Sequence, residues 1–110
     1  MLIAELDGVL TGYVVARHAA DEAEILDLAV DPDHRGGGQA SALLDALTQR
    51  VAAIATRLLF LEVRESNQAA RALYEGRGFV VVGRRAGYYQ APPEDALILG
   101  LEIGTSSGPA

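Results

Sequence analysis

The stretch VDPDHRGGGQASALL (Val30–Leu44) places three consecutive glycines between a β-rich run and an apolar helical pattern. The run before it, Glu24–Val30, alternates like a strand with one better-buried face. After the glycines, apolar side chains recur at helical spacing at Leu43, Leu44, Leu47, Val51 and Ile54. We therefore expect a strand, a glycine loop and a helix from about Gln39 to Ala55. The loop is either a plain connector or a built site.

A strand that enters a helix through glycines leaves several backbone N–H groups unobstructed at the positive end of the helix dipole. This arrangement favours a phosphate group. The P-loop pattern does not fit, because no Lys-Ser/Thr pair follows the last glycine, and the GxGxxG spacing does not fit either. What remains is Arg35-x-x-Gly38-x-Ala40, a pattern that on its own also suits a connecting loop.

The other elements can be placed around this loop. Two β-rich runs, Leu2–Leu6 and Val9–Arg17, flank an Asp-Gly pair that favours a tight hairpin, and with Glu24–Val30 they predict an antiparallel meander. RLLFLEV (Arg57–Val63) is nearly continuous in apolar residues, as is typical of a strand buried on both sides. The order of strand, helix and strand predicts a parallel crossover.

A second, shorter helix is expected in ESNQAARALYEGRGF, with Ser66 or Asn67 as N-cap and Gly78 as its stop. Two further strands, Phe79–Arg85 and Asp95–Ile103, close the sheet. The connection between them contains Gly87, Tyr88, Tyr89, Pro92 and Pro93, and its two tyrosines suggest a wall for a ligand. We assign residues 1–103 to one α+β domain and residues 104–110 to a flexible tail.

Composition limits the function. The 110 residues are 50% hydrophobic, enough for one core, and fifteen acidic against nine basic residues argue against a nucleic-acid partner. The absence of cysteine excludes disulfides, thiolate metal sites and a cysteine nucleophile, and with two histidines we expect no metal. No apolar run is long enough for a membrane span, and the N-terminus carries acids where a signal peptide carries bases. We expect a soluble, cytoplasmic protein.

Two residues in the second half of the chain stand out. Glu62 interrupts an apolar run, where a carboxylate is costly to desolvate unless it is paired, hydrated or protonated, so it is either a partner of Arg64 or a functional group. Tyr74 lies on the apolar stripe of the second helix, where a tyrosine is usually a core residue with its hydroxyl at the rim.

Together, the glycine loop, the strand with Glu62, and the following helix with Asn67 and Tyr74 resemble the GNAT family of acetyl-CoA-dependent N-acetyltransferases. LEVRESNQAARALYE is the most specific part, and it resembles the ribosomal-protein-alanine (RimI-like) branch of that family. The similarity extends over nearly all of Leu2–Ile103. It implies the GNAT fold, an α/β (α+β) arrangement with a mixed, mostly antiparallel sheet and two flanking helices.

The resemblance implies that acetyl-CoA lies between the LDLAV and RLLFLEV strands. The pantetheine arm would pair with the backbone of Leu28, Ala29 and Val30, and Asn67 would hydrogen-bond to it. The pyrophosphate would be held by N–H groups of the loop and the helix start. The cofactor-binding residues implied there are Arg35, Gly36, Gly37, Gly38, Gln39, Ala40 and Ser41.

The resemblance also implies that Glu62 is the general base and Tyr74 the general acid. An α-amino group with a pKa of about 8 is mostly protonated at neutral pH and must lose a proton before it attacks a thioester, so a carboxylate is a suitable acceptor. A tyrosine can protonate the departing thiolate. The attack is expected to be direct, since the chain has no cysteine for an acyl-enzyme.

The implied acceptor is a protein N-terminal α-amine, namely the N-terminal alanine of a ribosomal protein. An acetyltransferase for a small amine or a lysine side chain, and a catalytically weak acyl-CoA-binding module, are the alternatives. The family begins with a further strand and two helices, so we expect an N-terminally truncated form of the fold. The edge around LIAEL would then be exposed, and we expect a homodimer or another partner to cover it.

Overall fold

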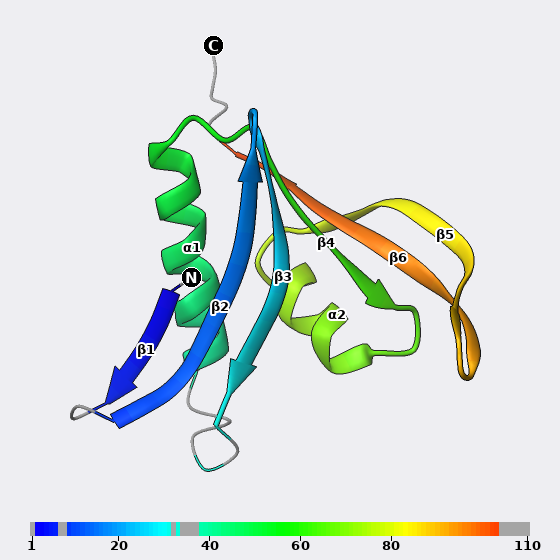
Figure 1. Cartoon of the computed structure of the whole chain (residues 1–110), viewed down its shortest axis with the longest axis horizontal. Coiled ribbons are helices and arrows are strands. Elements are labelled where there is room, and N and C mark those ends of the chain that lie inside the picture. The colour runs from blue at the N-terminus through cyan, green and yellow to red at the C-terminus, as the bar shows by residue number, and fades with distance from the viewer. Residues whose placement is uncertain (1, 7–8, 32, 34–37, 104–110) are drawn as a thin grey trace. The chain divides into compact units, whose positions relative to one another are not determined.

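The computed structural model describes residues 2–6, 9–31, 33 and 38–103 (Figure 1). The chain forms two compact units, Met1–Leu59 with Glu102–Ala110, and Phe60–Leu101. The described part of the first unit contains β1 (Leu2–Leu6), β2 (Val9–Ala19), β3 (Glu22–Val30) and α1 (Gln39–Ala53). β4 (Leu58–Arg64) runs from the first unit into the second, which continues with α2 (Gln68–Glu75), β5 (Val80–Gln90) and β6 (Pro93–Glu102).

In the first unit, β1, β2 and β3 form the predicted antiparallel meander, with β2 in the middle. β2 and β3 are longer than the sequence indicated, because the ladder continues through His18↔Ala23 and Ala19↔Glu22. The segment 18–23 that the sequence left between these two strands is therefore reduced to a tight turn, in which Ala20 has a φ of 56°.

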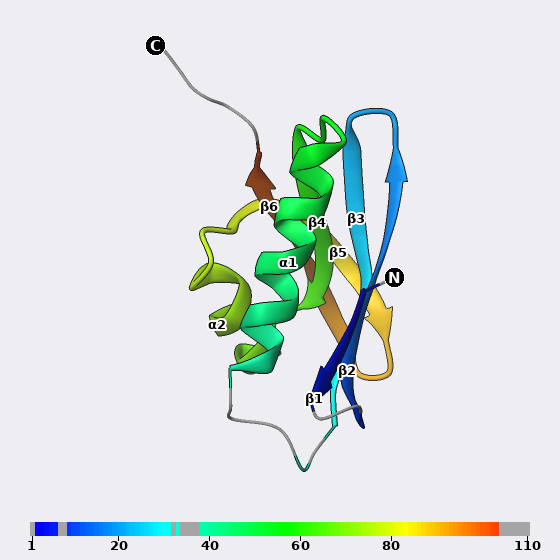
Figure 2. The same cartoon turned by 90° about the vertical axis from the view of Figure 1, so that its left-hand side faces the viewer.

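Helix α1 lies along this meander and contacts all three of its strands (Figure 2). Its buried residues are Leu43, Leu44, Leu47 and Val51. The fifth predicted core position, Ile54, is 55% exposed, because the helix ends at Ala53 and Ala55 adopts a φ of 63°. The helical period was thus correct up to the last turn.

Strand β4 differs from its prediction in burial. Leu59, Leu61 and Val63 are buried, whereas the alternate positions Leu58, Phe60, Glu62 and Arg64 are only half-buried. The expectation of a strand equally buried on both faces was wrong, since one face is only partly covered. Glu62 lies on that face, and this lowers the cost of placing a carboxylate within an apolar strand.

In the second unit the strand order is β4-β6-β5, and β5 pairs with β6 in a long antiparallel hairpin (Figure 1). The predicted connection from Gly87 to Pro93 is mostly strand, since Tyr89↔Glu94 and Gln90↔Pro93 still pair. The register shifts between Arg85 and Tyr89. Gly87 occupies this bulge with a φ of 61°.

Helix α2 begins as predicted. Asn67 is its N-cap, and its side-chain oxygen accepts a hydrogen bond of 3.1 Å from the Ala70 N–H. The helix ends at Glu75 with Gly76 as its cap, so Gly78, the predicted stop, lies beyond it and instead turns the chain toward β5 with a φ of 95°.

Candidate functional site

Within the described residues, the N-terminus of α1 has no side-chain cap. Gly38 occupies the N-cap position with a left-handed φ of 80°. The first helical hydrogen bond runs from Ala42 N–H to Gly38 O at 3.0 Å, so the helical ladder does not use the N–H groups of Gln39, Ala40 and Ser41. The first turn holds no acidic residue. An anion fits this position well.

The surroundings of Gly38 are open. A Cβ added there would meet nothing within 4 Å, so the glycine is explained by its positive φ and not by a close protein neighbour. Next to it, the Oε1 atom of Gln39 is buried and has no hydrogen-bond partner among the described residues. The open position at Gly38 suits an anion such as the pyrophosphate of CoA, whereas the Gln39 Oε1 atom is an acceptor and suits a hydrogen-bond donor of a ligand. The predicted contributions of Arg35, Gly36 and Gly37 lie outside the described residues.

The predicted pantetheine strand is the end of β3. Leu28, Ala29 and Val30 are half-buried, and on one side their backbones belong to the ladder with β2 through Val14↔Leu28 and the following pairs. The ladder continues one residue further, because Asp31 N–H donates to Thr11 O at 2.7 Å. This end of β3 is therefore fixed, as a strand that is to bind a ligand through its backbone must be.

Glu62 forms an ion pair that the sequence did not indicate. Its Oε2 lies 2.6 Å from Nε of Arg85, and its side chain is 19% exposed. The Oε2 atom is buried and makes no aligned hydrogen bond within the described part of the chain, so the contact is an ion pair only. The alternative that Glu62 pairs with Arg64 was wrong, because Arg64 instead pairs with Glu94 at 3.2 Å.

The end of the β5–β6 hairpin brings two arginines onto the two tyrosines. The Arg64 guanidinium lies 4.1 Å from the ring centroid of Tyr89, and that of Arg85 lies 5.0 Å from the centroid of Tyr88. The two rings contact each other edge to face. Tyr88 and Tyr89, which were predicted to line a ligand site, thus lie at the end of β5 and contact arginine side chains. The short spacing of Arg85 and Tyr88 in the sequence could have indicated one of these contacts, whereas Arg64 lies on another strand and gives no such signal.

Two carboxylates anchor the same hairpin. Hydrogen bonds from the Ser66 side chain and from the Ser66 N–H lower the pKa of Glu94, and Arg64 lowers it further. Asp95 accepts a 2.8 Å hydrogen bond from Gly87 N–H, which with Arg84 lowers the pKa of Asp95. The bulge glycine is thus held by the neighbouring strand. The amino-acid pattern alone does not indicate these contacts.

Tyr74 is buried on α2. Its ring packs edge to face on Phe79 with 5.3 Å between centroids, and the residue is 5% exposed. Asn67, at the start of the same helix, uses its side-chain oxygen as the cap. A carboxamide also carries a separate NH₂ donor, so capping is compatible with the predicted hydrogen bond to pantetheine.

No helix in the described ranges is long and apolar enough to cross a membrane. Among the same residues, no three His, Asp or Glu side chains gather in a way that could hold a metal ion.

In the first unit the uncapped start of α1 can bind an anion, and in the second unit the half-buried Glu62 can accept a proton. The chain belongs to the acetyltransferase (GNAT) family, whose model matches residues 1–79. Acetyl-CoA is accordingly its co-substrate, and the predicted GNAT fold, with a mixed, mostly antiparallel sheet and two helices, is confirmed.

Among curated proteins, the chain is 38% identical over 99 residues to the [ribosomal protein bS18]-alanine N-acetyltransferase of Escherichia coli (strain K12). The match covers 88% of this chain and 67% of that protein. The crystal structure of the ribosomal-protein-S18-alanine N-acetyltransferase from Escherichia coli matches with a TM-score of 0.85 and 36% identity, covering 94% of this chain and 68% of that one.

A Bacillus anthracis protein crystallised in complex with acetyl coenzyme A also matches, with a TM-score of 0.85 and 27% identity over 92% of this chain and 60% of that one. The chain therefore spans about two thirds of the length of these relatives.

Proposed function

We propose that the chain transfers the acetyl group of acetyl-CoA to the N-terminal α-amine of a protein, most specifically the N-terminal alanine of a ribosomal protein. The observation that carries the proposal is Glu62, a half-buried carboxylate on an apolar strand that forms an ion pair with Arg85. The names of relatives that are 36–38% identical support the choice of acceptor.

In the proposed reaction, Glu62 accepts a proton from the acceptor ammonium, directly or through water. The free amine then attacks the thioester carbonyl, a C–N bond forms, and the C–S bond breaks. Tyr74 gives its phenolic proton to the sulfur as the thiolate departs. The nitrogen loses its second proton as the amide forms, and this proton returns to the Tyr74 oxygen through solvent, while Glu62 releases its proton to solvent. Each proton transfer is worth typically about 10² to 10⁴ in rate. The products are the acetylated amine and CoA.

The chain's role toward the co-substrate is to bind and orient it. The uncapped N–H groups at the start of α1, from Gly38 to Ser41, would hold the pyrophosphate. The backbone at the end of β3 would pair with the pantetheine arm, and Asn67 would donate to it. Arg35, Gly36 and Gly37 complete the proposed cofactor set.

The test uses Glu62→Gln, which keeps the shape and removes the base. We expect kcat on an Ala-start peptide to fall by about 10² to 10⁴, while the Kd of acetyl-CoA measured by calorimetry changes less than about twofold. Glu65→Gln is the matched control, because Glu65 is a nearby acid that pairs with Arg84 instead. A Glu62→Gln protein that turns over normally once folded would contradict the mechanism.

The acceptor is tested separately. Turnover is measured on three acceptors: an Ala-start peptide, the same peptide with a blocked N-terminus and a free lysine, and a polyamine. Their relative rates distinguish the proposed activity from acetylation of a lysine side chain or a small amine. Binding of acetyl-CoA without turnover on any of them would instead indicate a catalytically weak acyl-CoA-binding module.

Three further expectations remain predictions. The first is the cytoplasmic location. The second is a homodimer or another partner at the edge strand β1, which light scattering of the purified chain would reveal. The third is the single domain over residues 1–103.

A further inference from the structure

We propose that Arg85 is a positioning residue for the reaction: it holds one oxygen of the Glu62 carboxylate, so that the other oxygen is presented to the acceptor amine. The inference rests on the proposed role of Glu62 as general base. It is carried by contacts within the second unit alone.

The first observation is the path of the ion pair. In the strand order β4-β6-β5, Glu62 and Arg85 lie on strands that are not neighbours, with β6 between them. Ala96 on β6 is the register partner of Arg85, so its side chain is on the same face, and it is completely buried. A small residue on the intervening strand lets the arginine reach across to the carboxylate at 2.6 Å.

The second observation concerns the two oxygens of Glu62. Oε2, the atom that faces Arg85, is buried, whereas the side chain as a whole is 19% exposed. The part that solvent reaches therefore lies on the other atoms of the side chain. A carboxylate can accept a hydrogen bond through either oxygen. When Arg85 holds one oxygen, the rotation of the carboxylate group is restricted, and the direction of the other oxygen is therefore set.

The third observation is that Arg85 is itself held. Its guanidinium packs over the Tyr88 ring. In a regular strand, residues three apart point to opposite faces, so this contact depends on the bulge in which Gly87 has a φ of 61°. The bulge, the tyrosine and the arginine therefore act together on one carboxylate.

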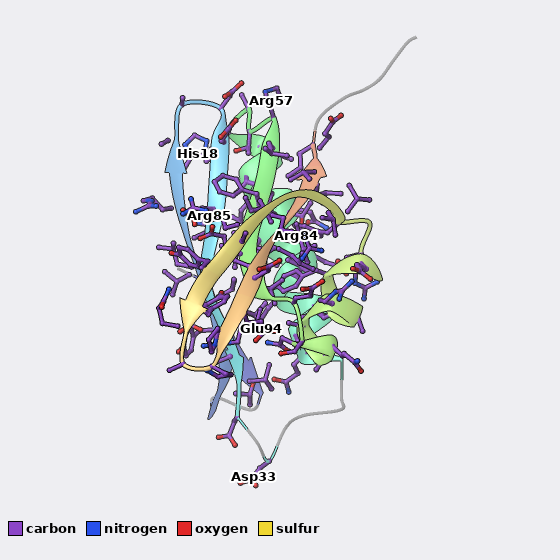
Figure 3. The ribbon with its side chains drawn as sticks, turned by 90° about the vertical axis from the view of Figure 1, so that its right-hand side faces the viewer. His18, Asp33, Arg57, Arg84, Arg85 and Glu94 are labelled. Carbon is purple, nitrogen blue, oxygen red and sulfur yellow. The ribbon has the colours of Figure 1, made fainter. Side chains whose placement is uncertain are left out.

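A purely structural role would predict little effect on turnover. The Arg85 side chain is 55% exposed, and ion pairs at such positions contribute little to stability. Its neighbour Arg84 offers a matched comparison, because it lies on the other side of β5 (Figure 3) and pairs with Glu65 and Asp95. The two arginines differ in which carboxylate they hold.

The experiment compares Arg85→Met, Arg85→Lys and the control Arg84→Met in the full chain, with acetyl-CoA and an Ala-start peptide. We expect Arg85→Met to lower kcat about tenfold to hundredfold, since a small misplacement of a reacting group has effects of this size, with the Kd of acetyl-CoA unchanged. Arg85→Lys, which keeps the cation, should recover most of the rate. Arg84→Met should stay within about threefold of the unmodified chain.

A double-mutant cycle decides whether the effect passes through Glu62. In the Glu62→Gln background, Arg85→Met should lower kcat no further. An equal loss in both backgrounds, or no loss in the Glu62 background, would overturn the inference, as would failure of Arg85→Lys to recover any rate. If Glu62→Gln itself kept full activity, the proposed base would fail first, and that outcome is distinct from the others.

Discussion

Tyr74 combines a packing contact with a proposed chemical role, and a single substitution separates them. Tyr74→Phe keeps the ring that packs on Phe79 and removes only the hydroxyl. We expect kcat to fall by about tenfold or more, while the free energy of unfolding changes by no more than about 1.5 kcal/mol. Steady-state kinetics and urea unfolding measure the two quantities.

The control for Tyr74→Phe is Tyr13→Phe, which removes a tyrosine hydroxyl that donates to Asp27 at 2.8 Å in the first unit. It should leave kcat unchanged. Equal kcat for the Tyr74 variant and the unmodified chain would show that the thiolate is protonated by another group.

At the scale of residues, the sequence could flag Glu62 but could not give its partner. A carboxylate within an apolar strand can be recognised from the amino-acid sequence alone. Its partner Arg85 is 23 positions away and two strands across the sheet, and the nearer Arg64 was the simpler expectation. Only the β5–β6 register and the burial of alternate β4 residues reveal which arginine reaches it.

At the scale of elements, the N-terminus of α1 is the feature most open to test. In Gly38→Val, a β-branched residue would have to adopt a φ of 80°, and its side chain would stand where a phosphate is expected. We expect the Kd of acetyl-CoA to rise about tenfold or more, because the added side chain obstructs the phosphates at the start of the helix. Calorimetry measures it.

Gly87→Val is the matched control for Gly38→Val. Gly87 also has a positive φ and open space around it, but it belongs to the β5 bulge. It should lower stability without weakening acetyl-CoA binding. A Gly38→Val protein with an unchanged Kd would mean that the loop is only a connector.

The elements themselves were predictable to different degrees. Periodicity located both helices and all the strands, because each pattern is local. The ends of the elements were less predictable where pairing with another strand extends a strand through turn-forming residues. Strand β5 is an example, because it continues past Gly87 while β6 still pairs with it. The loop residues Arg35, Gly36 and Gly37 remain predictions from the sequence pattern.

At the scale of the whole molecule, the paired carboxylates predict how stability depends on pH. The pKa of Glu94 and of Asp95 is lowered in the folded chain, so their contribution is present at neutral pH and is lost as the pH falls through the folded pKa values. We expect Tm to fall between about pH 5 and pH 3. Scanning calorimetry over this range measures the decline.

Glu94→Gln should show a lower Tm than the unmodified chain at pH 7 and a smaller decline in acid, because the group that protonates is gone. Asp33→Asn, at an exposed position in the first unit, is the control and should keep the original profile. Identical pH profiles for Glu94→Gln and the unmodified chain would show that the Ser66 and Arg64 contacts do not govern acid stability.

The glycine that starts α1 also has a consequence for protein engineering. A usual way to stabilise a domain is to place Ser, Asp or Asn at a bare N-cap, which typically adds about 1 kcal/mol. At Gly38 such a change would put a side chain at a φ of 80°, which favours glycine, and an oxygen where the co-substrate's phosphates are proposed to bind. The bare N-cap of α1 is therefore not a position where the usual capping substitution is expected to stabilise the chain, and position 38 should be held fixed in any such selection.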